Sequence, residues 1–187
     1  MKGIVFNLLE GFISDNWGED AYEEVLGMCP VHSRGPFVGP STYPDSALMT
    51  MVAMACQKLG VTVPVAVHLF GKYCFPRLAG KFPLFLEGHT HPVSFLKIID
   101  NVIHVEVKKL FKDAEPPRII ISDAGPGVVH LHYESKRKLC ALATGLLEGC
   151  ADYFHTPVQY HHIRCMADGH PECEFEVVFG QTREQAA

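Results

Sequence analysis

The sequence predicts an α+β protein, with a helical N-terminal lobe packed on a lobe that holds a four-stranded antiparallel sheet and helices. Apolar residues recur at three- and four-residue spacing through much of the first two-thirds of the chain, which is typical of amphipathic helices. After Pro116 and Pro117 the chain becomes rich in strand-forming residues, with hairpin patterns around residues 125–127 and 168–169. The predicted order in this second lobe is β-β-α-β-β.

The helices and strands can be placed in order from their periodicity and their end residues. Pro44 suits a first helical turn and Gly60 a helix end, which bounds one helix well, while Pro76 predicts an interruption in the next. We expect helices at residues 3–16, 19–28, 44–59, 63–78, 92–112 and 136–154. We expect strands at residues 118–122, 128–133, 157–166 and 173–179, the last with strictly alternating apolar positions.

Length and composition limit the domain count and the class of function. The 187 residues suit one domain, with a helical lobe at about residues 1–62 and an α+β lobe at about 63–182. Hydrophobic residues make up 48% of the chain, enough for a full core and for an apolar cofactor or a protein partner. The net charge of −5 argues against nucleic-acid binding, and no apolar run is long enough to span a bilayer.

The N-terminus and the cysteines predict a cytoplasmic protein. Glu10 ends the first apolar run, and acidic residues rather than a cleavage site follow, so a signal peptide is not expected. The seven cysteines are odd in number and unevenly spaced, which favours reduced thiols or metal ligands over a disulfide framework.

His104 is the first residue that could carry chemistry. It lies at the margin of the apolar stripe of the helix predicted over residues 92–112, where a histidine usually packs or bonds locally. A neutral imidazole on a stiff helix is also what an axial haem ligand requires, so both interpretations stay open on this residue alone.

The second candidate is the extended segment that holds Tyr133, Ser135 and Arg137. Alternate residues of an extended chain point to one side, so a phenol, a hydroxyl and a guanidinium are presented together. Such donors suit a pair of carboxylates, because arginine can bind one of them through two hydrogen bonds. The alternative is a polar strand end leading into a helix with Ser135 as its N-cap.

The third candidate is a set of cysteines and a histidine near the second hairpin. His162 and Cys165, then Cys173 after seven intervening residues, with Cys140 on the preceding helix, could form a tetrahedral Cys3His zinc site. Residues three apart on a regular strand face opposite ways, so a bulge or a strand end is needed between His162 and Cys165. The alternative is that Cys140 and Cys173 are small core residues.

Together these features resemble the haem-nitric oxide/oxygen binding family, H-NOX, which is related to the haem domain of soluble guanylate cyclase. The resemblance rests on the segments at residues 1–7, 103–106, 116–118 and 145–149 and on the Tyr-x-Ser-x-Arg motif at 133–137. It extends over essentially the whole chain, so we expect a stand-alone bacterial sensor with no attached cyclase or kinase and with haem between the lobes.

The resemblance implies a role for each candidate. His104 becomes the axial ligand of haem b, Tyr133, Ser135 and Arg137 hold the propionates, and Pro117 presses on the macrocycle and helps to distort it. One bacterial branch of the family carries zinc at the positions matching Cys140, His162, Cys165 and Cys173.

Gas selectivity is predicted from a departure from the family pattern. Oxygen-binding members place a tyrosine five residues after the motif arginine, where this chain has Leu142. The distal positions by rough alignment are mostly apolar: Val5, Leu9, Cys74, Leu78, Leu142 and Leu146. Bound oxygen needs a hydrogen-bond donor and nitric oxide does not, so we expect NO binding, weaker CO binding and no stable O2 complex.

The resemblance also suggests how a signal is passed on. The hypothesis is that NO weakens or breaks the iron bond to His104, and that the resulting shift regulates a separate histidine kinase or cyclic-di-GMP enzyme. The protein itself is not expected to be an enzyme, since the distal positions offer no acid/base pair. The alternative function is a zinc/thiol redox sensor that uses Cys140, His162, Cys165 and Cys173.

Overall fold

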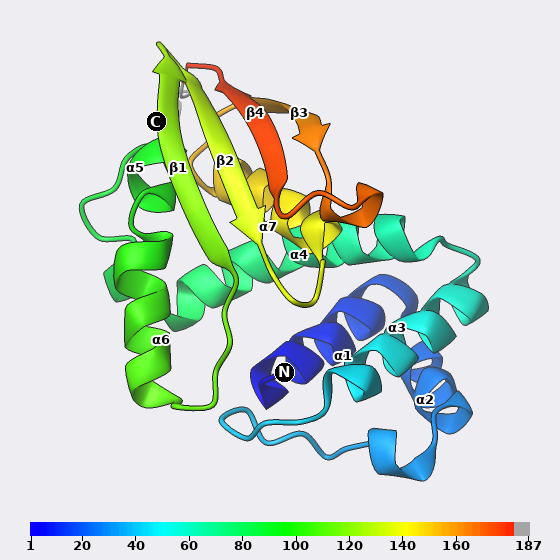
Figure 1. Cartoon of the computed structure of the whole chain (residues 1–187). Coiled ribbons are helices and arrows are strands. Elements are labelled where there is room, and N and C mark those ends of the chain that lie inside the picture. The colour runs from blue at the N-terminus through cyan, green and yellow to red at the C-terminus, as the bar shows by residue number, and fades with distance from the viewer. Residues whose placement is uncertain (182–187) are drawn as a thin grey trace, which may run out of the picture. The chain divides into compact units, whose positions relative to one another are not determined.

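The computed structural model describes residues 1–181 and divides into two compact units, one from Met1 to Phe70 and one that begins at Gly71. The first unit is helical and the second holds a four-stranded antiparallel sheet, as predicted (Figure 1). The predicted lobe end at residue 182 lies outside the described residues, and the assignment of one domain with a division near residue 62 stays a prediction.

The first unit is built from amphipathic helices around one core. The helices are α1 (Gly3–Trp17), α2 (Glu19–Met28), α3 (Asp45–Leu59) and the first part of α4 (Val63–Lys81). Phe6, Val25 and Met51 are fully buried, one from each of the first three helices. Gly60 ends α3 in the left-handed conformation with φ 68°, as its position in the sequence predicted.

Three of the predicted helices differ from expectation. The helix expected over residues 136–154 begins only at Cys140, and its N-cap is Leu139 rather than Ser135. Helix α4 continues past Pro76, so the predicted interruption is wrong for the described chain. Proline cannot bond the carbonyl of Lys72, and that carbonyl faces α7 (Cys140–Tyr153), where a Cβ on Gly149 would lie 2.7 Å from it. The expected single helix over residues 92–112 is instead α5 (Pro92–Leu96), a π-helical turn (Ile99–Ile103) and α6 (His104–Leu110).

The sheet has the strand order β1-β2-β4-β3, from β1 (Arg118–Gly125), β2 (Val128–Glu134), β3 (Val158–Arg164) and β4 (Cys173–Phe179). A bulge interrupts the pairing of β3 with β4 between His162 and Arg164. Helix α7 and the second half of α4 cover one face of the sheet (Figure 1). Val129, Phe175 and Val177 are buried there. The opposite face, here called the outer face, carries mostly polar side chains, with Ile120 and Val178 also exposed on it.

Tight backbone contact joins α4 to α7. A Cβ on Gly71 would lie 2.5 Å from the carbonyl oxygen of Leu142 and 2.9 Å from the nitrogen of Leu146. Only glycine allows the two helix backbones to approach this closely. Among the described helices, none alone is long and apolar enough to cross a membrane, and α3 with α4 meets that test only as a bent pair.

Candidate functional site

His104 begins α6 directly after the π-helical turn, and its side chain is only 14% exposed. Its Nδ1 lies 3.3 Å from Oδ1 of Asp100, one turn earlier. The same oxygen accepts a hydrogen bond of 3.3 Å from the backbone nitrogen of Ile119 on β1. Because Nδ1 faces Asp100, Nε2 is the nitrogen left to bind a ligand or a metal.

Burial also sets the charge of His104. It lowers the pKa of the imidazole below its ordinary value, and this outweighs Asp100 and a backbone hydrogen bond with Pro117, which both favour the protonated form. The ring is therefore neutral at neutral pH. A neutral imidazole keeps the lone pair that coordination to iron needs.

The structure brings Tyr133, Ser135 and Arg137 to the end of β2 and the turn that follows it. Tyr133 and Ser135 are buried at 4% and 8% exposure, while Glu134 between them is exposed, so these residues alternate as predicted. Strand β2 ends at Glu134 and Arg137 lies in a turn, so the expected extended segment does not reach Arg137. Burial raises the pKa of Tyr133, and a hydrogen bond with the side chain of Ser135 opposes that rise. Arg137 donates from Nη1 to the backbone carbonyl of Glu115 at 2.6 Å.

The predicted distal residues are divided between the two units. Val5 and Leu9 lie one turn apart on α1 in the first unit, where Leu9 is buried. In the second unit, Leu142 and Leu146 lie on α7 where it meets Gly71, and Cys74 is buried one turn after that glycine. Leu78 follows on α4 and is half-buried. Each of these side chains is apolar or, for Cys74, a buried thiol.

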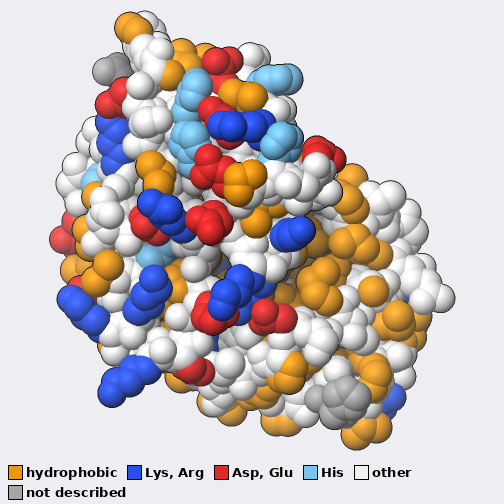
Figure 2. All heavy atoms as spheres, viewed as in Figure 1, with side chains coloured by type: hydrophobic (Ala, Val, Ile, Leu, Met, Phe, Trp, Pro, Cys, Tyr) orange, Lys and Arg blue, Asp and Glu red, His pale blue; other side chains and the backbone are white. Residues whose placement is uncertain are grey.

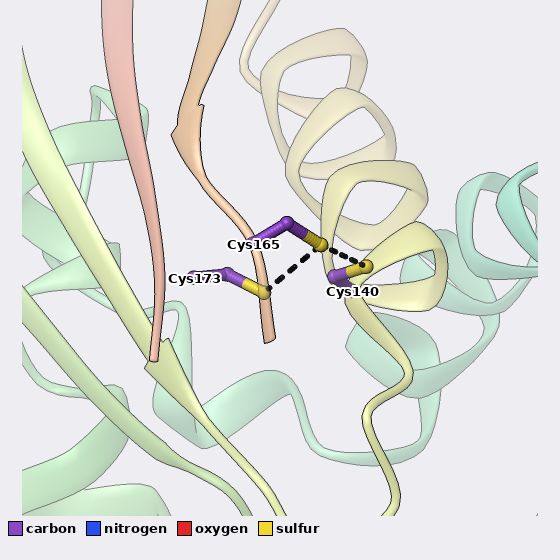
Figure 3. Close-up of side chains that lie close together, drawn as sticks. All are labelled: Cys140, Cys165 and Cys173. Atoms are coloured by element: carbon purple, nitrogen blue, oxygen red, sulfur yellow. Dashed lines mark hydrogen bonds between the residues drawn. The ribbon is translucent and has the colours of Figure 1, made fainter. Parts of the chain in front are cut away.

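Three of the four predicted zinc ligands lie together (Figure 3). The Sγ atom of Cys165 is 3.9 Å from that of Cys140 and 3.8 Å from that of Cys173. Their ligand atoms all fall within 4.8 Å of one another, a spacing that a single metal ion could draw together. All three are free cysteines.

Backbone donors point at this cluster. Met166 donates its N–H to Sγ of Cys173 at 3.2 Å, and Ala167 donates to Sγ of Cys165 at 3.4 Å. Such hydrogen bonds stabilise negative charge on sulfur, as metal-bound thiolates require. Burial raises the pKa of Cys173 to about 12, and burial with the neighbouring Cys165 raises that of Cys140.

His162 is not part of this cluster as it stands. Its ring stacks on Phe175 with the centroids 4.1 Å apart, and the side chain is exposed. The bulge that the sequence spacing required is present directly after His162. The assignment of His162 as the fourth ligand therefore stays a prediction.

Sequence reasoning did not single out a second group of metal-binding residue types, namely His130, His132 and Glu174 on the outer face of the sheet. The spacing of the two histidines, two residues apart on a predicted strand, is the pattern that could have indicated it.

A sequence model of the haem-NO-binding family matches residues 2–162. The chain belongs to this family. Solved H-NOX structures agree: a mutant H-NOX protein from S. oneidensis in the Fe(II) state is 29% identical, with a TM-score of 0.91 and full coverage of both chains. The Fe(II)NO form of an S. oneidensis H-NOX protein is 30% identical, with a TM-score of 0.89, 97% coverage of this chain and 100% of that one. An S. oneidensis H-NOX domain in the Fe(II)CO state is 29% identical, with a TM-score of 0.86 and 97% and 99% coverage.

The residues of this H-NOX chain fit a haem group. The neutral imidazole of His104 has Nε2 available, since its other nitrogen faces Asp100. Tyr133, Ser135 and Arg137 supply phenol, hydroxyl and guanidinium donors of the kind that bind carboxylates. H-NOX domains bind haem and diatomic gases, and this donor set is consistent with that property of the family.

Proposed function

We propose that this H-NOX protein is a nitric oxide sensor that regulates a separate signalling enzyme. The observation that supports it is the buried, neutral imidazole of His104, with Nδ1 occupied by Asp100 and Nε2 available. Haem b would supply a ferrous iron that takes a gas molecule. Tyr133, Ser135 and Arg137 bind the propionates in this proposal, and Pro117, which lies between α6 and β1, contacts the macrocycle.

Selectivity for nitric oxide follows from the apolar character of the distal residues. The proposed distal residues of the second unit are Cys74, Leu78, Leu142 and Leu146, and none carries a phenol or an amide. Bound oxygen carries partial negative charge and requires a donor, whereas nitric oxide does not. The proposed ligands are therefore NO and, more weakly, CO, with no stable O2 complex.

Signal transmission in this proposal depends on the tether that His104 provides. NO weakens or breaks the bond to His104, which frees the start of α6 and lets the surface formed by this segment change. The proposed partner is a histidine kinase or a cyclic-di-GMP enzyme. Because Asp100 bonds both His104 and the backbone of β1, movement of His104 is expected to reach the sheet.

The test combines absorption spectroscopy with one substitution. The purified ferrous protein is exposed to NO, CO and air in turn, and we expect a five-coordinate nitrosyl spectrum, a CO spectrum and no oxy spectrum. His104→Gly, supplied with haem and imidazole, is expected to regulate the partner as the NO-bound parent does. A stable oxy spectrum, or a His104→Gly protein that behaves like the NO-free parent, contradicts the proposal.

A second candidate function has its own observation, the triangle of Cys140, Cys165 and Cys173. We infer that these thiols hold zinc, with His162 as the fourth ligand after a change of rotamer, and release it on oxidation. The measurement is zinc content before and after hydrogen peroxide, in the parent and in a Cys165→Ser variant. Regulation of the partner by peroxide in His104→Gly would separate this function from gas sensing.

A further inference from the structure

The outer face of the sheet carries a group of histidine and glutamate side chains that the haem and cysteine sites do not use. His130 and His132 alternate along β2, and they pair across the strands with Glu176 and Glu174 of β4. Figure 2 shows histidine side chains gathered with acidic and basic ones over the sheet, in the upper part of the view. Four of these side chains therefore share one face of two neighbouring strands.

Three ligand atoms converge within this group. One ligand atom each from His130, His132 and Glu174 lies within 4.8 Å of the other two. Nδ1 of His130 is 3.2 Å from Oε1 of Glu174. An ion bound at about 2.0–2.2 Å from each ligand holds them about 3–4 Å apart, so small side-chain rotations suffice.

Each imidazole also has a second carboxylate on its other side. Nδ1 of His132 lies 2.9 Å from Oε1 of Glu172, and Nε2 of His130 lies 3.9 Å from Oε2 of Glu176. These contacts leave Nε2 of His132 and Nδ1 of His130 to bind an ion. Histidine ligands of metals usually donate their other ring N–H to a carboxylate, which fixes the tautomer and orients the ring.

Charge and burial favour a cation here. Glu174 has a side chain only 10% exposed, and Arg164 donates from Nε to its Oε2 at 2.8 Å, which leaves Oε1 facing His130. The carboxylates of Glu172, Glu174 and Glu176 outnumber the guanidinium of Arg164 by two charges. A divalent ion balances that excess, and the partly exposed histidines leave it open to solvent on one side.

We propose that His130, His132 and Glu174 form a second metal site, for a divalent ion of the class that accepts imidazole and carboxylate, such as Zn2+ or Ni2+. Imidazole ligands select these ions over Mg2+ and Ca2+, which prefer oxygen. The site is distinct from the cysteine cluster, because Cys173 is fully buried on the α7 side of the sheet, whereas Glu174, the next residue, points to the outer face. Glu172 is the orienting carboxylate of His132, while Glu176 lies farther from His130 at 3.9 Å and adds negative charge.

The test is equilibrium dialysis of the full-length, haem-loaded protein against Ni2+, with nickel and iron measured separately by elemental analysis. We expect His130→Gln and Glu174→Gln each to lose one bound nickel or to bind it at least about 10-fold more weakly. The exposed control His155→Asn is expected to retain it, and His130→Gln is expected to lose one nickel also in a Cys140→Ser background, where the cysteine cluster is already disrupted. Nickel binding that is lost in Cys140→Ser and kept in His130→Gln overturns the proposal, as does binding only above about 1 mM.

A second measurement avoids substitutions that could disturb folding. The parent protein is treated with diethylpyrocarbonate with and without Zn2+, and modified histidines are located by mass spectrometry. Zn2+ is expected to protect His130 and His132 together and to leave His155 reactive. Equal modification of His130 and His132 with and without Zn2+ contradicts the site.

Discussion

Replacing Gly71 with alanine tests the close packing of α4 on α7. The new Cβ would lie 2.5 Å from the carbonyl oxygen of Leu142, whereas an ordinary contact is 3.4 Å or more, so the helices must separate by about 0.9 Å. The atoms in the way belong to the backbone and cannot rotate aside. Overpacking of this kind costs about 1–3 kcal/mol, and the helix propensity of alanine returns about 1 kcal/mol. We expect a net loss of up to about 2 kcal/mol in the free energy of unfolding.

Gly80 provides the matched control on the same helix. A Cβ there meets nothing within 4 Å, so Gly80→Ala is expected to gain up to about 1 kcal/mol from helix propensity alone. Both variants are compared with the parent by urea denaturation followed by far-UV circular dichroism. The expected loss for Gly71→Ala corresponds to a melting temperature lower by up to about 8 °C. A Gly71→Ala protein as stable as Gly80→Ala would refute the argument from backbone contact.

Two further predictions concern the second unit. Asp100→Asn removes the carboxylate beside His104, which is expected to make the imidazole a weaker ligand of the iron. We expect a lower iron–histidine stretching frequency in resonance Raman spectra and haem affinity at least about 10-fold lower. An unchanged frequency and haem affinity would show that Asp100 only bonds Ile119. Burial raises the pKa of Cys150 and shields the thiol, so iodoacetamide at neutral pH is expected to leave it unmodified in the native protein and to alkylate it in urea, where the burial is lost. Mass spectrometry of the peptide measures this, and rapid native alkylation would contradict the burial.

The buried faces of β2 and β4 were predictable from the sequence, because each follows from the alternation of neighbouring residues along one strand. Alternation in β4 placed Cys173, Phe175, Val177 and Phe179 on one face, and the structure buries all four. The alternation of Tyr133, Glu134 and Ser135 was equally readable. These patterns depend only on the period of two along a strand.

The errors arise where distant segments decide the local structure. Pro76 does not end α4, although it removes the hydrogen bond to the carbonyl of Lys72; α4 packs on α7 at Gly149 there, a contact that no local rule shows. The π-helical turn before His104 has a similar origin. Asp100 in that turn bonds Ile119 of β1, a contact nineteen residues away along the chain.

Side-chain clusters that span strands depend on register, which the sequence does not state. His162 pairs with Phe175 and stacks on it, and Phe175 lies on the same buried face of β4 as Cys173. His132 pairs with Glu174 for the same reason, which creates the cluster on the outer face. One register of β4 against its two neighbours therefore sets His162 beside Phe175 on one face and builds the unexpected group on the other.

Asp100 connects His104, the candidate iron ligand, to strand β1 of the sheet, a connection that the sequence alone does not show. One carboxylate oxygen serves both Nδ1 of His104 and the backbone N–H of Ile119, at 3.3 Å each. If Nε2 binds iron as proposed, a change in that bond is expected to alter the hydrogen bond between the ring and Asp100, and with it the contact of Asp100 with β1. The cysteine triangle lies where β3 ends and β4 begins, and β3 is the opposite edge strand of the same sheet. In the proposed functions, gas binding therefore acts on the sheet through β1 and thiol chemistry acts on it next to β3. A partner enzyme that binds the sheet would respond to both signals.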